Sequence, residues 1–231
     1  MGEVFSGIPV PLARALVDGL GLGLAVETGT HLGESAALLS EMVDHVWTVE
    51  LSHDLVERAR ARLGETMAIT VLEGDSPAVL AGLAPRIDGP ALYWLDAHWC
   101  TGDTAGFEAQ CPLLREIEAL DASPTAAESA ILIDDARFFL ACPFPEYRRG
   151  DWPTFMEVVD LLRARHPRYV TTLLDVIIAG PPEARLVVEG FWQARLAADL
   201  DQSRERARQA EDALRARVAA PRRPDGHRHS S

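Results

Sequence analysis

Five strand-sized apolar segments of this chain each end on a carboxylate and lead into a helical pattern. The carboxylates at the segment ends are Glu27, Glu50, Asp75, Asp96 and the pair Asp134 and Asp135. These ends are roughly 20 to 40 residues apart, a spacing typical of βα units joined by right-handed crossovers. This repeated unit restricts the chain to an α/β fold more strongly than any other feature of the sequence.

The predicted strands are apolar on both faces, which is typical of parallel strands covered by helices. They are residues 22–27, 45–49, 68–72, 91–95 and 129–133, with helical patterns at 8–20, 35–43, 54–63, 77–83, 111–120 and 152–166. We therefore predict an α/β fold with an open, doubly wound, mainly parallel Rossmann-like sheet. Such sheets bind ligands beyond the carboxyl ends of their strands, so the carboxylates are expected to surround a site.

The remaining segments predict additions to this sheet. Residues 169–174 and 175–179 indicate a C-terminal β-hairpin, and Pro181 and Pro182 end the domain at about residue 182. Residues 183–218 predict a long C-terminal helix, and 219–231 a disordered tail. The apolar first part of the helix is expected to pack on the domain or on a second subunit, as in a homodimer. Beyond Leu200 its apolar residues are too sparse for a coiled coil.

The segment 136–151 is long for a βα connection and rich in aromatic residues. It carries Phe138, Phe139, Phe144 and Tyr147. Such a loop predicts a lid or a wall of a substrate site. A surface loop held in place by aromatic anchors is the alternative.

Charge and composition exclude several functions. All 22 basic residues are arginine, so Schiff-base chemistry, a P-loop lysine and a lysine general base are excluded. The net charge is −13, and residues 1–200 carry −16 because residues 201–231 hold eight arginines and five acids. An acidic body repels nucleic acid and anionic membranes and suits cationic ligands. With no membrane-length apolar run and no signal-peptide pattern, we expect a soluble cytoplasmic protein.

The first predicted strand leads into the loop E-T-G-T-H-L-G, which carries Gly29, Thr30 and Gly33. Glycines allow a sharp strand-to-helix turn and a close approach of backbone to ligand, and the next helix points free N–H groups at that ligand. The pattern differs from the G-x-G-x-x-G of dinucleotide binding. Taken alone, this loop also fits an ordinary tight βα turn.

Five segments in order, ETGTHLGES, WTVE, LEGDS, LDAHW and LIDDA, resemble those of class I S-adenosylmethionine-dependent methyltransferases. Among these, the chain is most similar to the metal-dependent O-methyltransferases of the catechol and antibiotic-sugar (macrocin) kinds, over about residues 20–180. The resemblance implies methyl transfer from S-adenosylmethionine to a hydroxyl oxygen of a small molecule, such as a sugar or a catechol. A metal-dependent hydrolase on the same fold and a non-catalytic, cofactor-binding partner subunit are the alternatives.

The resemblance also implies which residues bind the cofactor. Glu27, together with the loop that carries Gly29, Thr30 and Gly33, would hold the methionyl part. Glu50 would accept hydrogen bonds from both ribose hydroxyls. An acid placed before the helix that follows Ser52 is the alternative for Glu50.

Asp75 and Ser76 follow the third strand, where the resembled family binds adenine. Capping of the helix that begins near Pro77 is the alternative for Asp75.

Asp96, Asp134 and Asp135 converge on one edge of the predicted sheet. Three carboxylates at close range repel one another unless a cation lies between them, and hard oxygen ligands favour Mg²⁺. We therefore predict a magnesium site at these three residues, with Asp96 also serving catalysis. An Asp135 that only caps the next turn is the alternative.

His98 follows Asp96 by two residues, so both side chains face the same way if the strand alternation persists. A histidine can take a proton from a substrate hydroxyl near neutral pH. The resembled sugar enzymes have Asp-x-Asp here, and the catechol type uses a nearby lysine, which this chain lacks. His98 is therefore predicted as general base, with a metal ligand or a residue behind the ligands as alternatives. A zinc site of His98, Cys100, Cys111 and Cys142 is a further alternative, although the irregular spacing lacks C-x-x-C.

Overall fold

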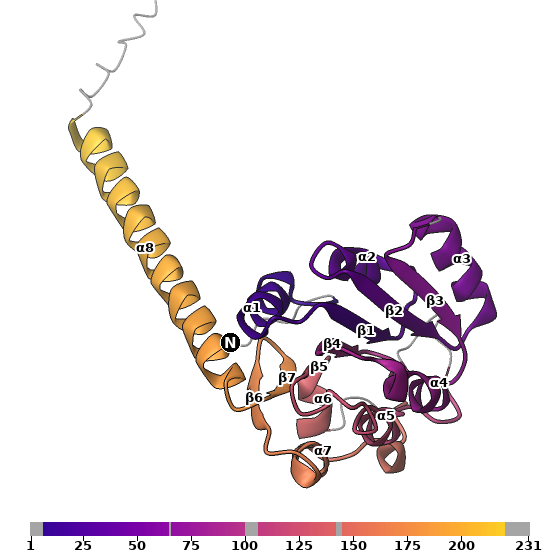
Figure 1. Ribbon diagram of the computed structural model, residues 1–231. Helices are drawn as coiled ribbons and strands as arrows, with labels where there is room; N and C mark the ends of the chain where they lie inside the picture. Colours follow the sequence, from indigo (N-terminus) through magenta and orange to yellow (C-terminus); the bar gives the residue numbers. More distant parts are fainter. Residues whose placement is uncertain (1–6, 65, 100–105, 142–144, 220–231) are drawn as a thin grey trace, which may run out of the picture. The chain divides into compact units, whose positions relative to one another are not determined.

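The computed structural model describes residues 7–64, 66–99, 106–141 and 145–219, and it contains one seven-stranded sheet (Figure 1). The strand order is β3-β2-β1-β4-β5-β7-β6. The strands are β1 Leu24–Thr28, β2 His45–Glu50, β3 Ile69–Glu73, β4 Ala91–Leu95, β5 Ala130–Ile133, β6 Tyr169–Leu173 and β7 Val176–Gly180. The first five are parallel, and β7 pairs antiparallel with both β5 and β6.

Helices cover both faces of the sheet. In Figure 1, α1, α2 and α3 lie along one side, and α4, α5 and α7 along the other. The helices are α1 Val10–Leu20, α2 Glu34–Ser40, α3 His53–Leu63, α4 Ser76–Leu83, α5 Leu113–Leu120, α6 Ala136–Leu140, α7 Phe155–Ala164 and α8 Ala184–Ala219, with short 3₁₀ turns η1 Ala84–Arg86 and η2 Arg149–Asp151. This arrangement confirms the predicted doubly wound, mainly parallel fold with its C-terminal hairpin and long helix.

The central strand β4 is buried along its whole length, from Ala91 to Leu95. A strand covered by helices on both faces requires this continuous apolar composition.

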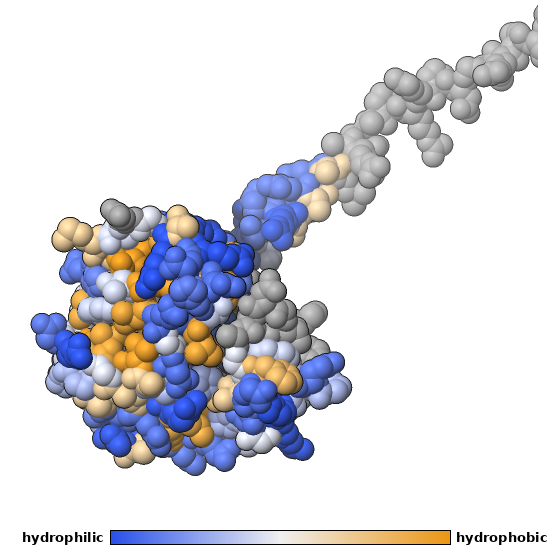
Figure 2. Space-filling view, turned by 90° about the vertical axis from the view of Figure 1, so that its right-hand side faces the viewer, coloured by the Kyte–Doolittle hydropathy of each residue, from blue (hydrophilic) through white to orange (hydrophobic). Residues whose placement is uncertain are grey.

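Figure 2 views the molecule from the right-hand side of Figure 1 and shows hydrophobic residues gathered on that face within a border of hydrophilic ones.

One part of the sequence reading needs correction. The segment 136–151 is not a loop throughout, because it begins with helix α6 and ends with η2. Phe138, Phe139 and Tyr147 are buried, which agrees with the alternative of aromatic anchors. Phe144 lies outside the described residues.

The chain divides into two compact units, Met1–Val188 and Glu189–Ser231. In the first unit, the start of α8 packs by its buried Ala184 and Val188, while Leu186 is 75% exposed. In the second unit, every described side chain from Leu196 to Ala213 is exposed. Within the part of the chain that the structure describes, no helix combines the length and apolarity needed to cross a bilayer.

Candidate functional site

A cavity of about 430 Å³ lies at the carboxyl ends of the first four parallel strands. Its described lining includes Gly29, Thr30 and His31 after β1, Val49, Glu50 and Leu51 around the end of β2, Gly74, Asp75 and Ser76 after β3, and Asp96, Ala97 and His98 after β4. The segment that contains Glu108, Ala109 and Pro112 also contributes to the lining. The cavity therefore brings together most of the site residues predicted from the sequence.

Gly29 is required where the first loop passes the end of β4. Its φ is +84°, and a Cβ atom at this position would lie 2.2 Å from the carbonyl oxygen of Asp96. A side chain cannot fit at that distance, so only glycine allows the loop to close the floor of the cavity. Gly33, with a φ of +78°, instead faces the side chain of Leu63 on α3, so it serves packing and is not in the described lining.

Glu50 is held rigidly at the cavity wall by two backbone donors. Its Oε2 accepts a hydrogen bond from His31 N at 2.9 Å, and its Oε1 accepts one from Ser52 N, also at 2.9 Å. Each carboxylate oxygen has a second lone pair, so the buried carboxylate can still accept hydrogen bonds from a ligand.

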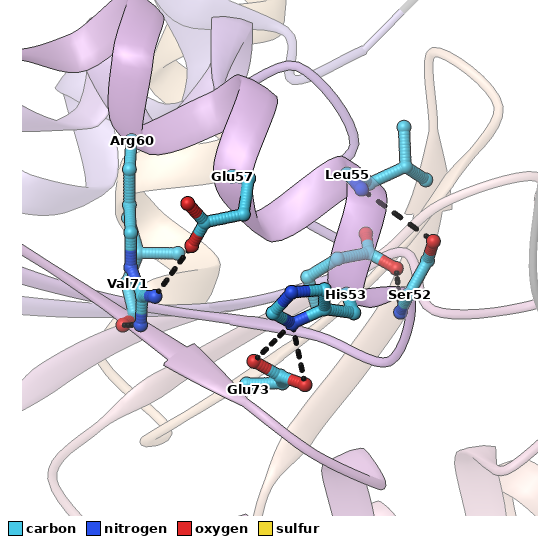
Figure 3. A network of polar contacts seen from close by, with 8 residues as sticks. Ser52, His53, Leu55, Glu57, Arg60, Val71 and Glu73 are labelled. Carbon is cyan, nitrogen blue, oxygen red and sulfur yellow. Dashed lines mark hydrogen bonds and ion pairs between the residues drawn. The ribbon is translucent and has the colours of Figure 1, made fainter.

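The turn after Glu50 is fixed by the start of α3. Ser52 caps the helix, with its hydroxyl oxygen accepting from Leu55 N at 3.5 Å (Figure 3). His53 lies 3.1 Å from Glu73 at the end of the neighbouring strand, and this hydrogen bond raises the pKa of His53. The Glu50 carboxylate thus also accepts a hydrogen bond at the start of α3, which agrees with its alternative interpretation as an acid placed before the helix.

Asp75 and Ser76 take different roles at the end of β3. The Asp75 side chain makes no capping hydrogen bond to α4, lines the cavity and lies 3.6 Å from Arg115. Ser76 donates from its hydroxyl to Glu116 at 2.5 Å. The helix-cap alternative for Asp75 is thus not supported.

Glu116, on α5, is a buried acid that the sequence reading missed. Burial raises its pKa to about 7, although the hydrogen bond from Ser76 acts in the opposite direction. A signal was present, because Glu116 falls on the same helical face as the apolar Leu113, Ile117 and Leu120. An acid at such a position is buried and needs a donor.

Glu27 does not line the cavity in the described structure. It is 1% exposed and accepts a hydrogen bond from the Thr48 hydroxyl at 2.5 Å, and that hydroxyl lies 2.6 Å from the hydroxyl of Thr30. Burial raises the pKa of Glu27 to about 8, and the charges of Asp96 and Glu50 add to this rise. Glu27 is therefore linked to the cavity only through the hydroxyls of Thr48 and Thr30, and it does not make the predicted direct contact with a cofactor in the described lining.

His98 lies between two acids and two aromatic rings. Its Nε2 is 3.0 Å from Asp135 Oδ2, and its Nδ1 is 3.6 Å from Asp96 Oδ1. The rings of Phe138 and Trp152 stand edge-on to the imidazole, with centroids 5.9 and 5.5 Å away. These contacts fix the ring plane, so the predicted base is firmly oriented.

The three aspartates predicted as metal ligands influence one another. Burial raises the pKa of Asp134 to about 8, and the charges of Asp96 and Asp135 add to this rise. Burial also raises the pKa of Asp96 to about 6. Burial acts in the same direction on Asp135, but the hydrogen bond and charge of His98, together with Arg137, outweigh it and lower the pKa of Asp135.

This pairing of Asp135 does not fit a magnesium site of three aspartates. Asp135 Oδ2 faces His98, and its Oδ1 lies 2.7 Å from the guanidinium of Arg137. A divalent cation at this carboxylate would be repelled by the permanent positive charge of the Arg137 guanidinium. Among the described residues, no group of three His, Cys, Asp or Glu is arranged to hold a metal ion.

The zinc alternative has little support in the described residues. Burial raises the pKa of the Cys111 thiol to about 12, which opposes the thiolate form that binds zinc. Cys100 and Cys142 lie outside the described residues.

Gln110 is a second buried residue that the sequence reading missed. Its Oε1 accepts from Arg148 N at 2.7 Å and from Trp152 Nε1 at 3.3 Å, and its Nε2 donates to the carbonyl of Glu146 at 3.3 Å. One side chain thus anchors residues 146–152, including the Trp152 ring beside His98. No sequence pattern marks it, because its partners lie more than 30 residues away.

Comparisons with known proteins place this geometry in a structural context. No protein-family model matches the chain, and no curated protein matches it. The O-methyltransferase TomG from Streptomyces achromogenes, involved in tomaymycin synthesis and solved in complex with SAM, is 15% identical, with a TM-score of 0.51 over 74% of this chain and 77% of that one. An O-methyltransferase from Bacillus cereus in complex with SAH is 17% identical, with a TM-score of 0.52 over 74% of this chain and 78% of that one.

At these identities the likeness shows the fold. The chain has the fold of these O-methyltransferase structures, as the ordered segments at its strand ends indicated.

Proposed function

We propose that this protein transfers a methyl group from S-adenosylmethionine to a hydroxyl oxygen of a small molecule, such as a sugar or a catechol. The observation that carries this proposal is the cavity at the strand ends, whose lining includes Glu50, Asp75 and His98. The structures of the same fold in complex with SAM or SAH support it.

The described residues fit the cofactor. The close approach of Gly29 to β4 leaves its loop free of side-chain bulk at the cavity floor. Glu50 keeps two lone pairs for the ribose hydroxyls while its other two accept backbone hydrogen bonds. Asp75 offers a carboxylate to a donor at the base of the cofactor. When bound, S-adenosylmethionine supplies a methyl group on a positively charged sulfur.

The reaction needs an acceptor oxygen that is correctly positioned and deprotonated. His98 is the residue that removes the proton. His98 takes the proton of the acceptor hydroxyl as the oxygen forms its bond to the methyl carbon and the carbon–sulfur bond breaks. The electron pair of that bond leaves with the sulfur, so the products are a methyl ether and S-adenosylhomocysteine. Asp96 Oδ1 lies 3.6 Å from His98 Nδ1, and its negative charge stabilises the imidazolium that forms.

Magnesium has no step in this proposal, because Asp135 is already paired with the Arg137 guanidinium and hydrogen-bonded to His98. The magnesium ion stays a prediction from the sequence resemblance. It is tested by the melting temperature with and without Mg²⁺, which a ligand of the folded state raises by mass action.

The experiment that tests the proposed function is calorimetric titration with S-adenosylhomocysteine. We expect binding in the micromolar range, and a loss of about 1–3 kcal/mol in Glu50→Ala, because a charge-assisted hydrogen bond to ribose is removed. Glu73→Ala is the matched control, since Glu73 pairs in register with Glu50 on the neighbouring strand but is not in the described lining. A parent chain that fails to bind, or equal losses in both variants, would contradict the assignment.

Turnover is measured by release of S-adenosylhomocysteine with catechols and with vicinal sugar diols. Cofactor binding without any methyl transfer would favour the non-catalytic partner subunit instead.

A further inference from the structure

Asp135 belongs to a chain of four ionisable side chains, His98, Asp135, Arg137 and Asp175, that no sequence pattern indicated. His98 Nε2 lies 3.0 Å from Asp135 Oδ2, Asp135 Oδ1 lies 2.7 Å from Arg137, and Arg137 also pairs with Asp175. Asp135 and Asp175 are only 12% exposed, and His98 5% by side chain. Arg137 is therefore bound between two acids, one at the end of β5 and one in the turn between β6 and β7.

The backbone of these residues is held in an uncommon conformation. Asp135 has a φ of +55°, and Leu174 and Asp175 form a two-residue hairpin turn with φ of +54° and +62°. Such turns normally use glycine or asparagine, and a positive φ costs conformational energy in most other residues. Strained residues of this kind persist where the surroundings fix them, and they gather at functional sites.

Two further hydrogen bonds join the two strained segments. Ala136 N donates to the carbonyl of Asp175 at 2.8 Å, and Arg137 N donates to Asp175 Oδ1 at 3.1 Å. The hairpin turn thereby determines where the Arg137 guanidinium lies, and the guanidinium determines where Asp135 points. A solvent-exposed ion pair would not require these two hydrogen bonds or the positive φ angles.

The hydrogen bond to Asp135 also determines which nitrogen of the His98 ring carries the proton. A carboxylate only accepts hydrogen bonds, so Asp135 Oδ2 requires the proton of His98 to be on Nε2. In the neutral ring, Nδ1 is then the basic nitrogen, and it lies on the side of Asp96, which lines the cavity.

We propose that Arg137, held by Asp175, is a built-in cation that holds Asp135 against His98 and neutralises this carboxylate, which the sequence predicted as a metal ligand. Arg137, Asp175 and Asp135 are positioning residues, and His98 is the group they orient. The inference rests on the proposed function only for the use of His98 as a base. The arrangement of charges and the histidine tautomer stand independently of it.

The first test is nitrogen NMR of the full chain labelled with ¹⁵N-histidine. In the parent, the His98 signals should show the neutral tautomer with its proton on Nε2. Arg137→Met should alter the Nε2 signal or mix the tautomers, and Arg137→Lys should restore part of the parent pattern. Arg62→Met is the matched control, because Arg62 pairs with Glu34 at 2.7 Å on an exposed surface of the same unit. A parent His98 with its proton on Nδ1, or parent-like signals in Arg137→Met, would overturn the proposal.

The second test is titration with Mn²⁺, followed by electron paramagnetic resonance. We expect no specific site of submillimolar affinity in the parent and at least tenfold tighter binding in Arg137→Met, because the variant frees Asp135 for a cation. Tight Mn²⁺ binding by the parent that Asp135→Asn abolishes would overturn the proposal. Circular dichroism shows that each variant is folded, and S-adenosylhomocysteine titration of the same samples reports separately on the proposed function.

Discussion

Replacement of Glu27 by glutamine should change how the stability of the protein depends on pH. Glu27 is fully buried, and burial raises its pKa from the ordinary 4.5 to about 8. Between these two values the folded protein holds a proton that the unfolded chain releases, so this group lowers the free energy of unfolding as pH rises. Each pH unit is worth about 1.36 kcal/mol, so the effect reaches about 5 kcal/mol by pH 8.

Glutamine does not titrate, and its side-chain oxygen can still accept the hydrogen bond from Thr48. The assay is urea unfolding of the parent and Glu27→Gln at intervals between pH 5 and 8.5. The stability of the variant relative to the parent should increase by up to about 1.4 kcal/mol per pH unit, and by about 4 kcal/mol in all between pH 5 and pH 8.5. The difference between the chains isolates Glu27 from Asp134, Asp96 and Glu116, whose pKa values burial also raises.

Exposed Glu118→Gln is the control, and it should change stability by no more than about 0.5 kcal/mol at any pH. If the difference between Glu27→Gln and the parent is the same at pH 5 and pH 8.5, Glu27 does not hold a proton in the folded state and the reasoning fails.

Two further predictions concern the segment 146–152 anchored by Gln110 and the C-terminal helix. Gln110→Ala should cost about 1–3 kcal/mol and speed tryptic cleavage after Arg148 or Arg149, because the anchored backbone loses its partners; exposed Gln193→Ala is the control, and equal cleavage rates would contradict the anchoring role. A chain that ends at Leu200 should unfold with parent stability, whereas one that ends at Pro182 should lose about 2–4 kcal/mol with the buried Ala184 and Val188. Light scattering tests the homodimer expected through the apolar first part of the helix: a dimer that the chain ending at Leu200 keeps and the chain ending at Pro182 loses supports it, and a monomeric parent contradicts it.

Much of the fold could be predicted because its signals are local. The apolar runs that became β1 to β5 and the helical patterns between them are short-range properties of the chain, and the carboxyl ends of parallel strands must share one edge. The sequence could therefore predict that Glu50, Asp75, Asp96 and His98 share one site, and all four line the same cavity. Gly29 belongs with them, since a strand-to-helix turn demands a residue without a side chain there.

The tertiary structure decided how the charges at that edge are paired. Asp134 and Asp135 both follow the end of β5, so the sequence alone cannot distinguish their roles. The backbone of Asp135 has a positive φ, and its carboxylate lies against His98 and Arg137. Asp175 reaches the same place from a hairpin 40 residues later, and Gln110 and Glu116 find their partners across similar separations. Sequence periodicity reports which face of an element a residue occupies. Which group neutralises a buried charge depends on long-range contacts, so only the folded chain could show that Asp135 pairs with Arg137.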